Sequence, residues 1–186
     1  MKNRTKIQSM IYIALMAVII TVCSWISIPG AVPFTLQTFA VFTALLLLGT
    51  RDGLISIIVY LLLGAVGVPV FSGFRGGIGH LAGPTGGYLI GFLVMGFVFG
   101  IVRHFIKHPL ASAITASILG LAACYAFGTV WFVIVYSSAN SAITYGAALS
   151  MCVLPFIIPD AIKMVLAIIL SERVKALVPS LRSARK

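Results

Sequence analysis

The chain has 186 residues, of which 61% are hydrophobic and 9% are charged, and its mean hydropathy is +1.16. This composition excludes a water-soluble globular domain and predicts an integral membrane protein. At about 20 residues per span, the chain has room for about six helices and no separate soluble domain. We therefore expect residues 1–186 to form a single domain.

Long windows without charge define the first predicted spans. No Asp, Glu, Lys, Arg or His occurs in residues 7–50, 53–74 or 109–159. The first predicted span, residues 7–28, is too long for the apolar core of a signal peptide. The second, residues 34–48, is short, and we expect it to begin with unwound chain over 34–38. Gln37 and Thr38 would then lie at membrane depth, where polar groups need partners.

A glycine-rich stretch follows the third predicted span, residues 54–68, which itself follows a polar turn at 49–53. Residues 73–91 hold eight of the 18 glycines, together with Arg75 and His80. Glycine allows positive φ angles and close approach of the backbone. Irregular chain between spans is costly unless protein shields it or it lines a cavity. We expect this stretch to form one wall of a binding site.

The remaining spans are predicted at 84–101, at 110–136 and from Pro159 to about residue 170. Gly87 and Gly91 are four residues apart, as are Gly96 and Gly100, a spacing typical of closely packed membrane helices. The start of the last helix is placed at Pro159 because a proline suits a first helical turn.

The formal net charge of +10 has to be interpreted by position, because the places of the cations along the chain predict the topology. With a cytoplasmic N-terminus and six spans, 11 of the 13 Lys and Arg residues lie on the inner side. This positive-inside pattern predicts an all-α membrane protein with six transmembrane helices and cytoplasmic N- and C-termini. The basic face is expected to meet anionic lipids, and nucleic-acid binding is not supported. The inner cations are Lys2, Arg4, Lys6, Arg51, Arg103, Lys107, Arg173, Lys175, Arg182, Arg185 and Lys186.

The two exceptions are Arg75 and Lys163, which fall toward the outer side. Lys163 lies three residues after Asp160, so both share one face of a helix. An ionisable residue within a span indicates a functional site. The alternative is a structural ion pair at the start of the last helix, with Asp160 favoured by the helix dipole. That alternative does not explain Arg75, for which the sequence leaves no acidic partner on the outer side. A cation beside a glycine-rich loop suits an anionic ligand.

Other chemistries find little support in the sequence. Residues 77–82 match the dinucleotide pattern G-x-G-x-x-A, but no strand precedes them. There is no P-loop, no convincing catalytic triad and no set of metal ligands, so we expect no enzyme activity, no cofactor and no metal. Cys23, Cys124 and Cys152 lie in apolar context and are expected to be buried small hydrophobes. For His80 we expect a hydrogen bond within its loop.

Several segments closely resemble one known family. They are Val32-Pro-Phe-Thr-Leu-Gln-Thr38, Tyr60-Leu-Leu-Leu-Gly-Ala-Val-Gly-Val-Pro-Val-Phe71, Gly83-Pro-Thr-Gly-Gly-Tyr-Leu-Ile-Gly-Phe92 and Pro159-Asp-Ala-Ile-Lys163. They resemble BioY, the biotin-binding S component of energy-coupling factor (ECF) vitamin transporters. The resemblance covers nearly the whole chain, and the Gly-Pro-Thr-Gly-Gly-Tyr block is specific to that family.

The resemblance implies a substrate-binding subunit in the cell membrane of a prokaryote. It implies six helices, capture of biotin from the outer side, and energy from a separate module. That module pairs a transmembrane coupling protein with two ABC-type ATPases. S components often dock through an Ala-xxx-Ala step on the first helix, whereas this chain has Ala14-Leu-Met-Ala17, a spacing of three. Transport without the module also stays open.

The resemblance also suggests roles for individual residues. Biotin has a ureido ring with two N–H donors and a carbonyl, a thiophane ring and a carboxylate tail. Asp160 would accept from a ureido N–H, and Lys163 would donate to the ureido carbonyl or to the tail. Arg75 is the better candidate for the tail carboxylate. Further candidates are Gln37 and Asn140 for ureido hydrogen bonds, and Tyr88 and Trp25 for packing on the thiophane ring.

Alternatives from other classes stay open at this point. A small intramembrane enzyme would use Asp160 and His80 as acid and base. The chain could instead be an S component for another vitamin, such as thiamine or riboflavin, or a purely structural subunit of a larger complex. For Trp25, which lies near a predicted span end, a place in the aromatic belt is the alternative to ligand contact.

Overall fold

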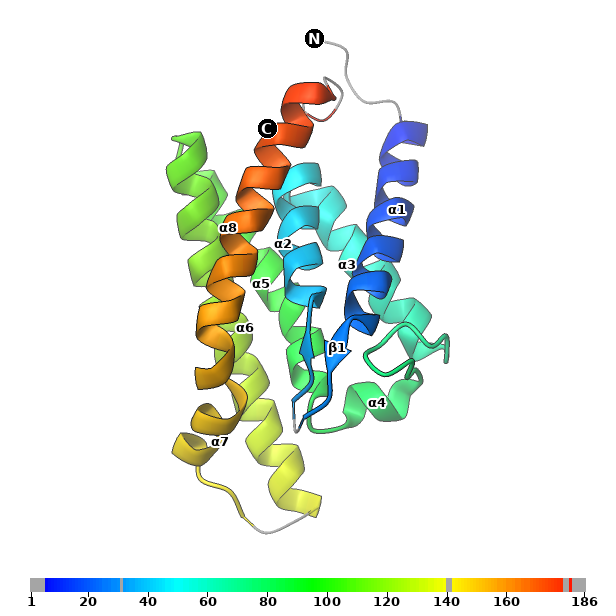
Figure 1. Cartoon of the computed structure of the whole chain (residues 1–186), viewed down its shortest axis with the longest axis vertical. Helices are drawn as coiled ribbons and strands as arrows, with labels where there is room; N and C mark the ends of the chain where they lie inside the picture. Colours follow the sequence, from blue (N-terminus) through cyan, green and yellow to red (C-terminus); the bar gives the residue numbers. More distant parts are fainter. Residues whose placement is uncertain (1–5, 31, 140–141, 179–180, 182–186) are drawn as a thin grey trace.

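The structure is a computed structural model that describes residues 6–30, 32–139, 142–178 and 181. Within these residues the fold is helical apart from one pair of two-residue strands, so the predicted all-α class is confirmed (Figure 1). The elements in chain order are α1 (Lys6–Trp25), β1 (Ser27–Ile28), β2 (Phe34–Thr35), α2 (Gln37–Leu48), α3 (Thr50–Ala65), α4 (Ile78–Ala82), α5 (Gly86–Phe105), α6 (Pro109–Ala139), α7 (Tyr145–Cys152) and α8 (Leu154–Leu177).

Helix α2 is the centre of the bundle. It packs against α1, α3 and α8, and ten of its 12 residues are buried. A helix that is apolar on all sides is expected in such a position. Helices α5 and α6 pack along each other, and α5 also packs on α3. Helix α8 packs mainly against α2 and makes few contacts with α6. A pocket lies between α6 and α8, because residues of both helices line it.

Glycines on α5 set its distance from two neighbouring helices. A Cβ at Gly87 would lie 2.3 Å from the Trp131 Cβ on α6, so no side chain fits there. A Cβ at Gly100 would lie 2.5 Å from the Thr50 methyl on α3. Each predicted small-residue step therefore serves a different partner: Gly87 and Gly91 face α6, and Gly96 and Gly100 face α3.

Four described helices are long and apolar enough to cross a membrane, namely α1, α5, α6 and α8. They correspond to the predicted first, fourth, fifth and sixth spans, and they make the chain a multi-pass membrane protein. The predicted second and third spans correspond to α2 and α3, which have 12 and 16 residues. Both are shorter than a full crossing of about 20 residues.

Two predicted boundaries are wrong. The polar turn expected at 49–53 is reduced to Gly49, whose φ of 85° breaks the chain direction, and α3 begins at Thr50. The last helix begins at Leu154 rather than at Pro159, because Pro155 occupies its first turn. Pro159 lies inside α8 and only removes one N–H from its hydrogen-bond ladder. Asp160 is therefore more than a turn from the helix start, beyond the reach of the dipole effect invoked for it.

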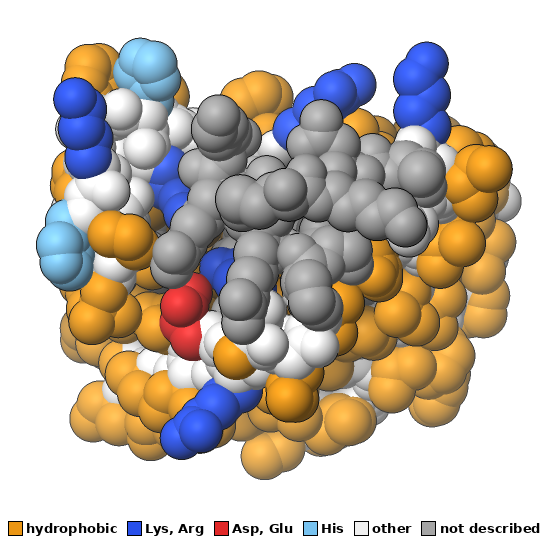
Figure 2. Space-filling model, turned by 90° about the horizontal axis from the view of Figure 1, so that it is seen from above, with side chains coloured by type: hydrophobic (Ala, Val, Ile, Leu, Met, Phe, Trp, Pro, Cys, Tyr) orange, Lys and Arg blue, Asp and Glu red, His pale blue; other side chains and the backbone are white. Residues whose placement is uncertain are grey.

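Most of the cations that the structure describes lie at one end of the molecule. The first turn of α1, the α2–α3 junction, the α5–α6 turn and the last turns of α8 all meet there (Figure 1). These segments carry Lys6, Arg51, Arg103, Lys107 and Lys175. Seen from that end, Lys, Arg and His side chains lie around the edge of the face together with one acidic side chain, and the surrounding surface is mostly hydrophobic (Figure 2). We call this surface the basic end.

Candidate functional site

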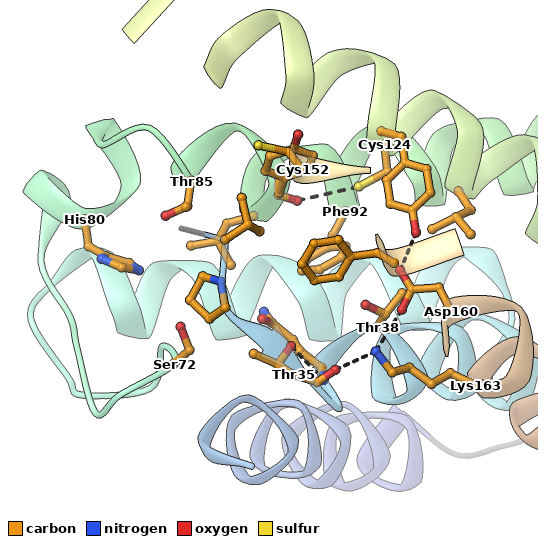
Figure 3. Close-up of a pocket in the computed structure, with 18 residues that line it drawn as sticks. Thr35, Thr38, Ser72, His80, Thr85, Phe92, Cys124, Cys152, Asp160 and Lys163 are labelled. Carbon is orange, nitrogen blue, oxygen red and sulfur yellow. Dashed lines mark hydrogen bonds and ion pairs between the residues drawn. The ribbon is translucent and has the colours of Figure 1, made fainter. Parts of the chain in front are cut away.

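A pocket opens among α5, α6, α8 and the chain before α2, toward the end of the molecule opposite the basic end. Its walls are largely apolar, and two charged side chains stand at one end of it (Figure 3). The lining residues used below are Thr35, Gln37, Ser72, His80, Thr85, Tyr88, Phe92, Tyr125, Phe156, Asp160 and Lys163.

The charged end of the pocket is an ion pair on α8. The Lys163 Nζ lies 2.8 Å from the Asp160 Oδ1, and these residues are only 5% and 3% exposed. Lys163 also donates to the Thr35 carbonyl at 2.7 Å and stands 4.1 Å from the centre of the Phe34 ring. The Tyr125 hydroxyl donates to the Asp160 Oδ2 at 2.5 Å. The predicted ion pair is thus present, and it lies in the pocket wall.

This pair retains hydrogen-bonding capacity for a ligand. An ammonium group has three donors, and Lys163 uses two of them in the bonds described. A carboxylate has about four acceptor sites, and Asp160 uses one on each oxygen. One donor and further acceptor sites therefore stand side by side in a buried setting, where hydrogen bonds to charged groups are strong.

The β1–β2 hairpin positions part of the charged end. Ser27 pairs with Thr35 and Ile28 with Phe34 in an antiparallel register. This pairing holds the chain extended just before α2, so the Thr35 carbonyl points to Lys163 rather than into a helix. The predicted unwound entry to the second span is confirmed over residues 34–36, whereas Gln37 and Thr38 already belong to α2.

Two further predicted site residues line the same pocket. Gln37 is buried, and its Nε2 donates to the Tyr60 hydroxyl at 2.8 Å, which fixes the amide. The Tyr88 hydroxyl lies 3.0 Å from the Thr129 Oγ1. Both side chains are therefore held by neighbours before any ligand binds, which lowers the entropic cost of binding.

The glycine-rich stretch forms the mouth of the pocket, at the end away from the ion pair (Figure 3). It contributes His80, Thr85, Tyr88 and Leu89 to the lining, and Ser72, the residue just before it, lines the pocket as well. A second, outer pocket shares Pro33, Ser72, His80 and Thr85 with the first and is also lined by Arg75. The two pockets therefore adjoin, and Arg75 lies in the outer one.

His80 lies where the two pockets meet, in α4. Its ring stacks on the Phe71 ring, and the two ring centroids are 5.2 Å apart. This contact differs from the hydrogen bond that the sequence suggests for His80. Burial, and secondly the Arg75 guanidinium, hold the pKa of His80 below its ordinary value of 6.5. The imidazole is therefore neutral at pH 7, and it adds no positive charge beside Arg75.

The other predicted site residues lie apart. Arg75 is exposed and reaches only the outer pocket. Trp25 does not line either pocket: its Nε1 donates to the Pro69 carbonyl at 2.9 Å, and its ring lies 5.0 Å from that of Phe74. Asn140 lies outside the described residues.

The sequence interpretation missed Tyr125, Thr35 and two cysteines. Tyr125 is a polar group in the middle of a predicted span, the same signal that drew attention to Gln37. The Thr35 backbone carbonyl gives no signal in a sequence. Cys124 and Cys152 are buried as predicted, but both also line the pocket, whereas Cys23 is only half-buried.

The arrangement suits binding of a small molecule rather than chemistry upon it. His80 and Asp160 lie at opposite ends of the pocket (Figure 3), so they do not form an acid–base pair. Among the described residues, no three His, Cys, Asp or Glu side chains are grouped so as to hold a metal ion. A largely apolar cavity with a few fixed polar groups is typical of ligand sites.

Comparison with known proteins identifies relatives along the whole chain. The profile of the BioY family matches residues 1–180. The "Probable biotin transporter BioY" of Pyrococcus horikoshii is 38% identical over 171 residues, covering 91% of this chain and 98% of the relative. The "Biotin transporter BioY" of Thermotoga maritima is also 38% identical over 171 residues, covering 91% and 97%.

A solved structure shares the fold. The crystal structure of the S-component for biotin from an ECF-type ABC transporter aligns with a TM-score of 0.81. The two chains are 28% identical, and the alignment covers 95% of each.

Proposed function

The chain belongs to the BioY family, and we propose that it captures biotin as the substrate-binding subunit of an ECF-type vitamin transporter. It is a multi-pass membrane transport protein and not an enzyme. The observation that carries the choice of site is the buried Asp160–Lys163 pair at one end of an apolar pocket.

The ureido ring of biotin fits the charged end of the pocket. Asp160 accepts a hydrogen bond from a ureido N–H, and the third donor of Lys163 goes to the ureido carbonyl. Asp160 repels a carboxylate, so the tail must point the other way. Gln37 adds a hydrogen-bonding group beside the ring, and Phe92, Tyr88 and Phe156 supply apolar contact for the thiophane ring.

The tail of biotin then runs to the mouth. The outer pocket adjoins the inner one at Ser72, His80 and Thr85, and Arg75 is the cation that lines it. We assign the tail carboxylate to Arg75, since an arginine pairs well with a carboxylate. Neutral His80 and the hydroxyls of Ser72 and Thr85 provide a polar passage between the inner and the outer pocket.

The proposal extends to topology and partners. We propose six crossings, with α2 and α3 completed by the irregular chain at their outer ends, and both termini in the cytoplasm of a prokaryotic cell. The concentration of cations at one end supports this orientation. Energy would come from a transmembrane coupling protein and two ABC-type ATPases. Residues 1–186 would then act as one domain.

The test is equilibrium binding of biotin to the purified full chain in detergent. We expect tight binding by the parent and loss of about 10-fold to 150-fold in affinity for Asp160→Asn and Lys163→Ala, because each change removes a charged hydrogen-bonding partner of the ureido ring. Glu172→Gln is a matched control. It alters a second i,i+3 pair on α8, Lys175–Glu172, which is partly exposed and far from the pocket.

Two outcomes would count against the proposal. Parent-like biotin affinity in both pocket variants would remove Asp160 and Lys163 from the site. Tighter binding of thiamine or riboflavin than of biotin would contradict the assigned substrate. Mass spectrometry of the released ligand checks the enzyme alternative, since a binding subunit returns biotin unmodified.

A further inference from the structure

The basic end contains a pocket of its own, far from the biotin site. It lies where α3 begins, α5 ends and α6 begins, and it encloses about 510 Å³. That is many times the roughly 10–15 Å³ that a cavity needs to hold one water molecule. We call it the basic pocket, and its lining residues are Gly49, Thr50, Arg51, Gly100, Arg103, His104, Ile106, Lys107, Pro109 and Ser112.

The charges around the basic pocket favour an anion. Arg51, Arg103 and Lys107 line it, and no acidic side chain does so among the described residues. Asp52, the adjacent acid on α3, is not part of the lining. The pocket also adjoins the first turns of α3 and α6, whose N–H groups attract negative charge, and the last turn of α5, whose dipole opposes it. The three cations therefore carry the preference for an anion.

Ser112 is an independent sign of a missing partner. It is 2% exposed, it lines the basic pocket, and its Oγ has no hydrogen-bond partner within the part of the chain that the structure describes. A buried hydroxyl without a partner is costly. A phosphate oxygen seated at the start of α6 would satisfy it.

An apolar groove continues from the basic pocket along the flank of the molecule. It shares Thr50, Gly100 and His104 with that pocket, and its other lining residues are Phe97, Ile101 and Phe105. These three side chains are 60%, 58% and 77% exposed, and they lie on the outer face of α5. The site is therefore amphipathic, with cations at the end of the bundle and an apolar track leading toward the membrane interior.

We propose that the basic pocket and this groove together bind one anionic phospholipid. The phosphate would lie among Arg51, Arg103, Lys107 and Ser112, and an acyl chain would run along Phe97, Ile101 and Phe105. A free phosphate would use only the first half of this site. The groove is what identifies the ligand as a lipid of the leaflet at the basic end.

The test uses the full chain purified in a neutral detergent and titrated with phosphatidylglycerol or phosphatidylcholine. Native mass spectrometry counts the lipids retained, and a thermal shift reports stabilisation. We expect one phosphatidylglycerol to be retained and to raise the melting temperature, with no such effect of phosphatidylcholine. Arg51→Gln with Lys107→Gln should weaken retention about 30-fold, from about fivefold per cation.

Arg173→Gln is the matched control, because Arg173 is an exposed cation near the basic end that does not line the pocket. It should retain phosphatidylglycerol as the parent does. An equal loss of phosphatidylglycerol retention in the control and in the double variant would overturn the site, because any surface cation would then contribute to lipid binding. Parent-like retention by the double variant would also overturn it, as would an equal thermal shift from inorganic phosphate alone. Biotin affinity should be unchanged in all three proteins, so this outcome is separate from that of the biotin test.

Discussion

At the scale of single residues, the Asp160–Lys163 pair combines two roles that the sequence presented as alternatives. The pair is buried and tied to Tyr125 and to the Thr35 carbonyl, as a structural ion pair would be. It also lines a pocket and keeps free donor and acceptor sites. Burying two ions costs desolvation free energy. Because the pair is already buried in the folded protein, that cost arises during folding and not when the ligand binds.

Arg75 provides a test of ligand orientation. If it meets the tail carboxylate, Arg75→Gln should weaken biotin binding by about tenfold or more, because a charge-assisted hydrogen bond is lost. Biotin amide lacks the carboxylate charge, so Arg75→Gln and the parent should bind biotin amide with equal affinity. Titration of both ligands into both proteins measures the coupling. Equal losses for biotin and its amide would contradict the assignment.

His80 predicts a pH dependence of stability. Its pKa is held below 6.5 in the folded protein, so the unfolded chain binds more protons as the pH falls through that value. The folded state should therefore lose stability from about pH 7 downward, until the lowered pKa is passed. We expect His80→Gln to flatten the fall in melting temperature between about pH 7.5 and pH 5.

Arg75→Gln is the companion variant for that measurement. Removing the guanidinium leaves burial as the remaining cause of the lowered pKa, so the slope should fall only in part. A parent-like slope in His80→Gln would show that other groups govern the acid response.

At the scale of elements, the glycines of α5 determine how closely its neighbouring helices pack. Its four spaced glycines bring α6 to one face and α3 to another, and Tyr88 and Phe92 on the same helix line the pocket. The glycine spacing in the sequence predicted close packing. It did not predict that the two steps would serve different helices, because that depends on where α3 and α6 lie around α5.

Gly87→Ala tests this packing. The added methyl would stand 2.3 Å from the Trp131 Cβ, so the helices must separate. We expect a loss of about 1–3 kcal/mol in stability, measured as a fall of several degrees in melting temperature. Gly146→Ala on α7 is the control, since nothing lies within 4 Å of its added Cβ and alanine favours helix. Equal melting temperatures for the two variants would contradict the argument.

At the scale of the whole molecule, the segregation of charge sets the proposed orientation. The basic end gathers segments that are far apart in sequence, whereas the pocket proposed for biotin opens toward the other end. Translocating cations is disfavoured, so the basic end should stay in the cytoplasm.

Cysteine labelling in intact cells checks this orientation. Ala142 and Lys107 are both exposed, and they flank α6 at its two ends, Ala142 after the helix and Lys107 before it. In a background in which Cys23, Cys124 and Cys152 are all changed to Ala, a membrane-impermeant maleimide should label Ala142→Cys in whole cells. Lys107→Cys should react only after the cells are permeabilised. The reverse pattern would invert the proposed topology.

The sequence by itself determined the class of the protein, its helix content, the segregation of its cations and the Asp160–Lys163 motif. These are properties of composition and of spacing along one helix, so they need no knowledge of other elements. Only the tertiary structure decided that Tyr125 and the Thr35 carbonyl complete the ion pair, and that Trp25 lies apart from the pocket. These facts depend on contacts between residues distant in the chain, whose geometry is set by packing.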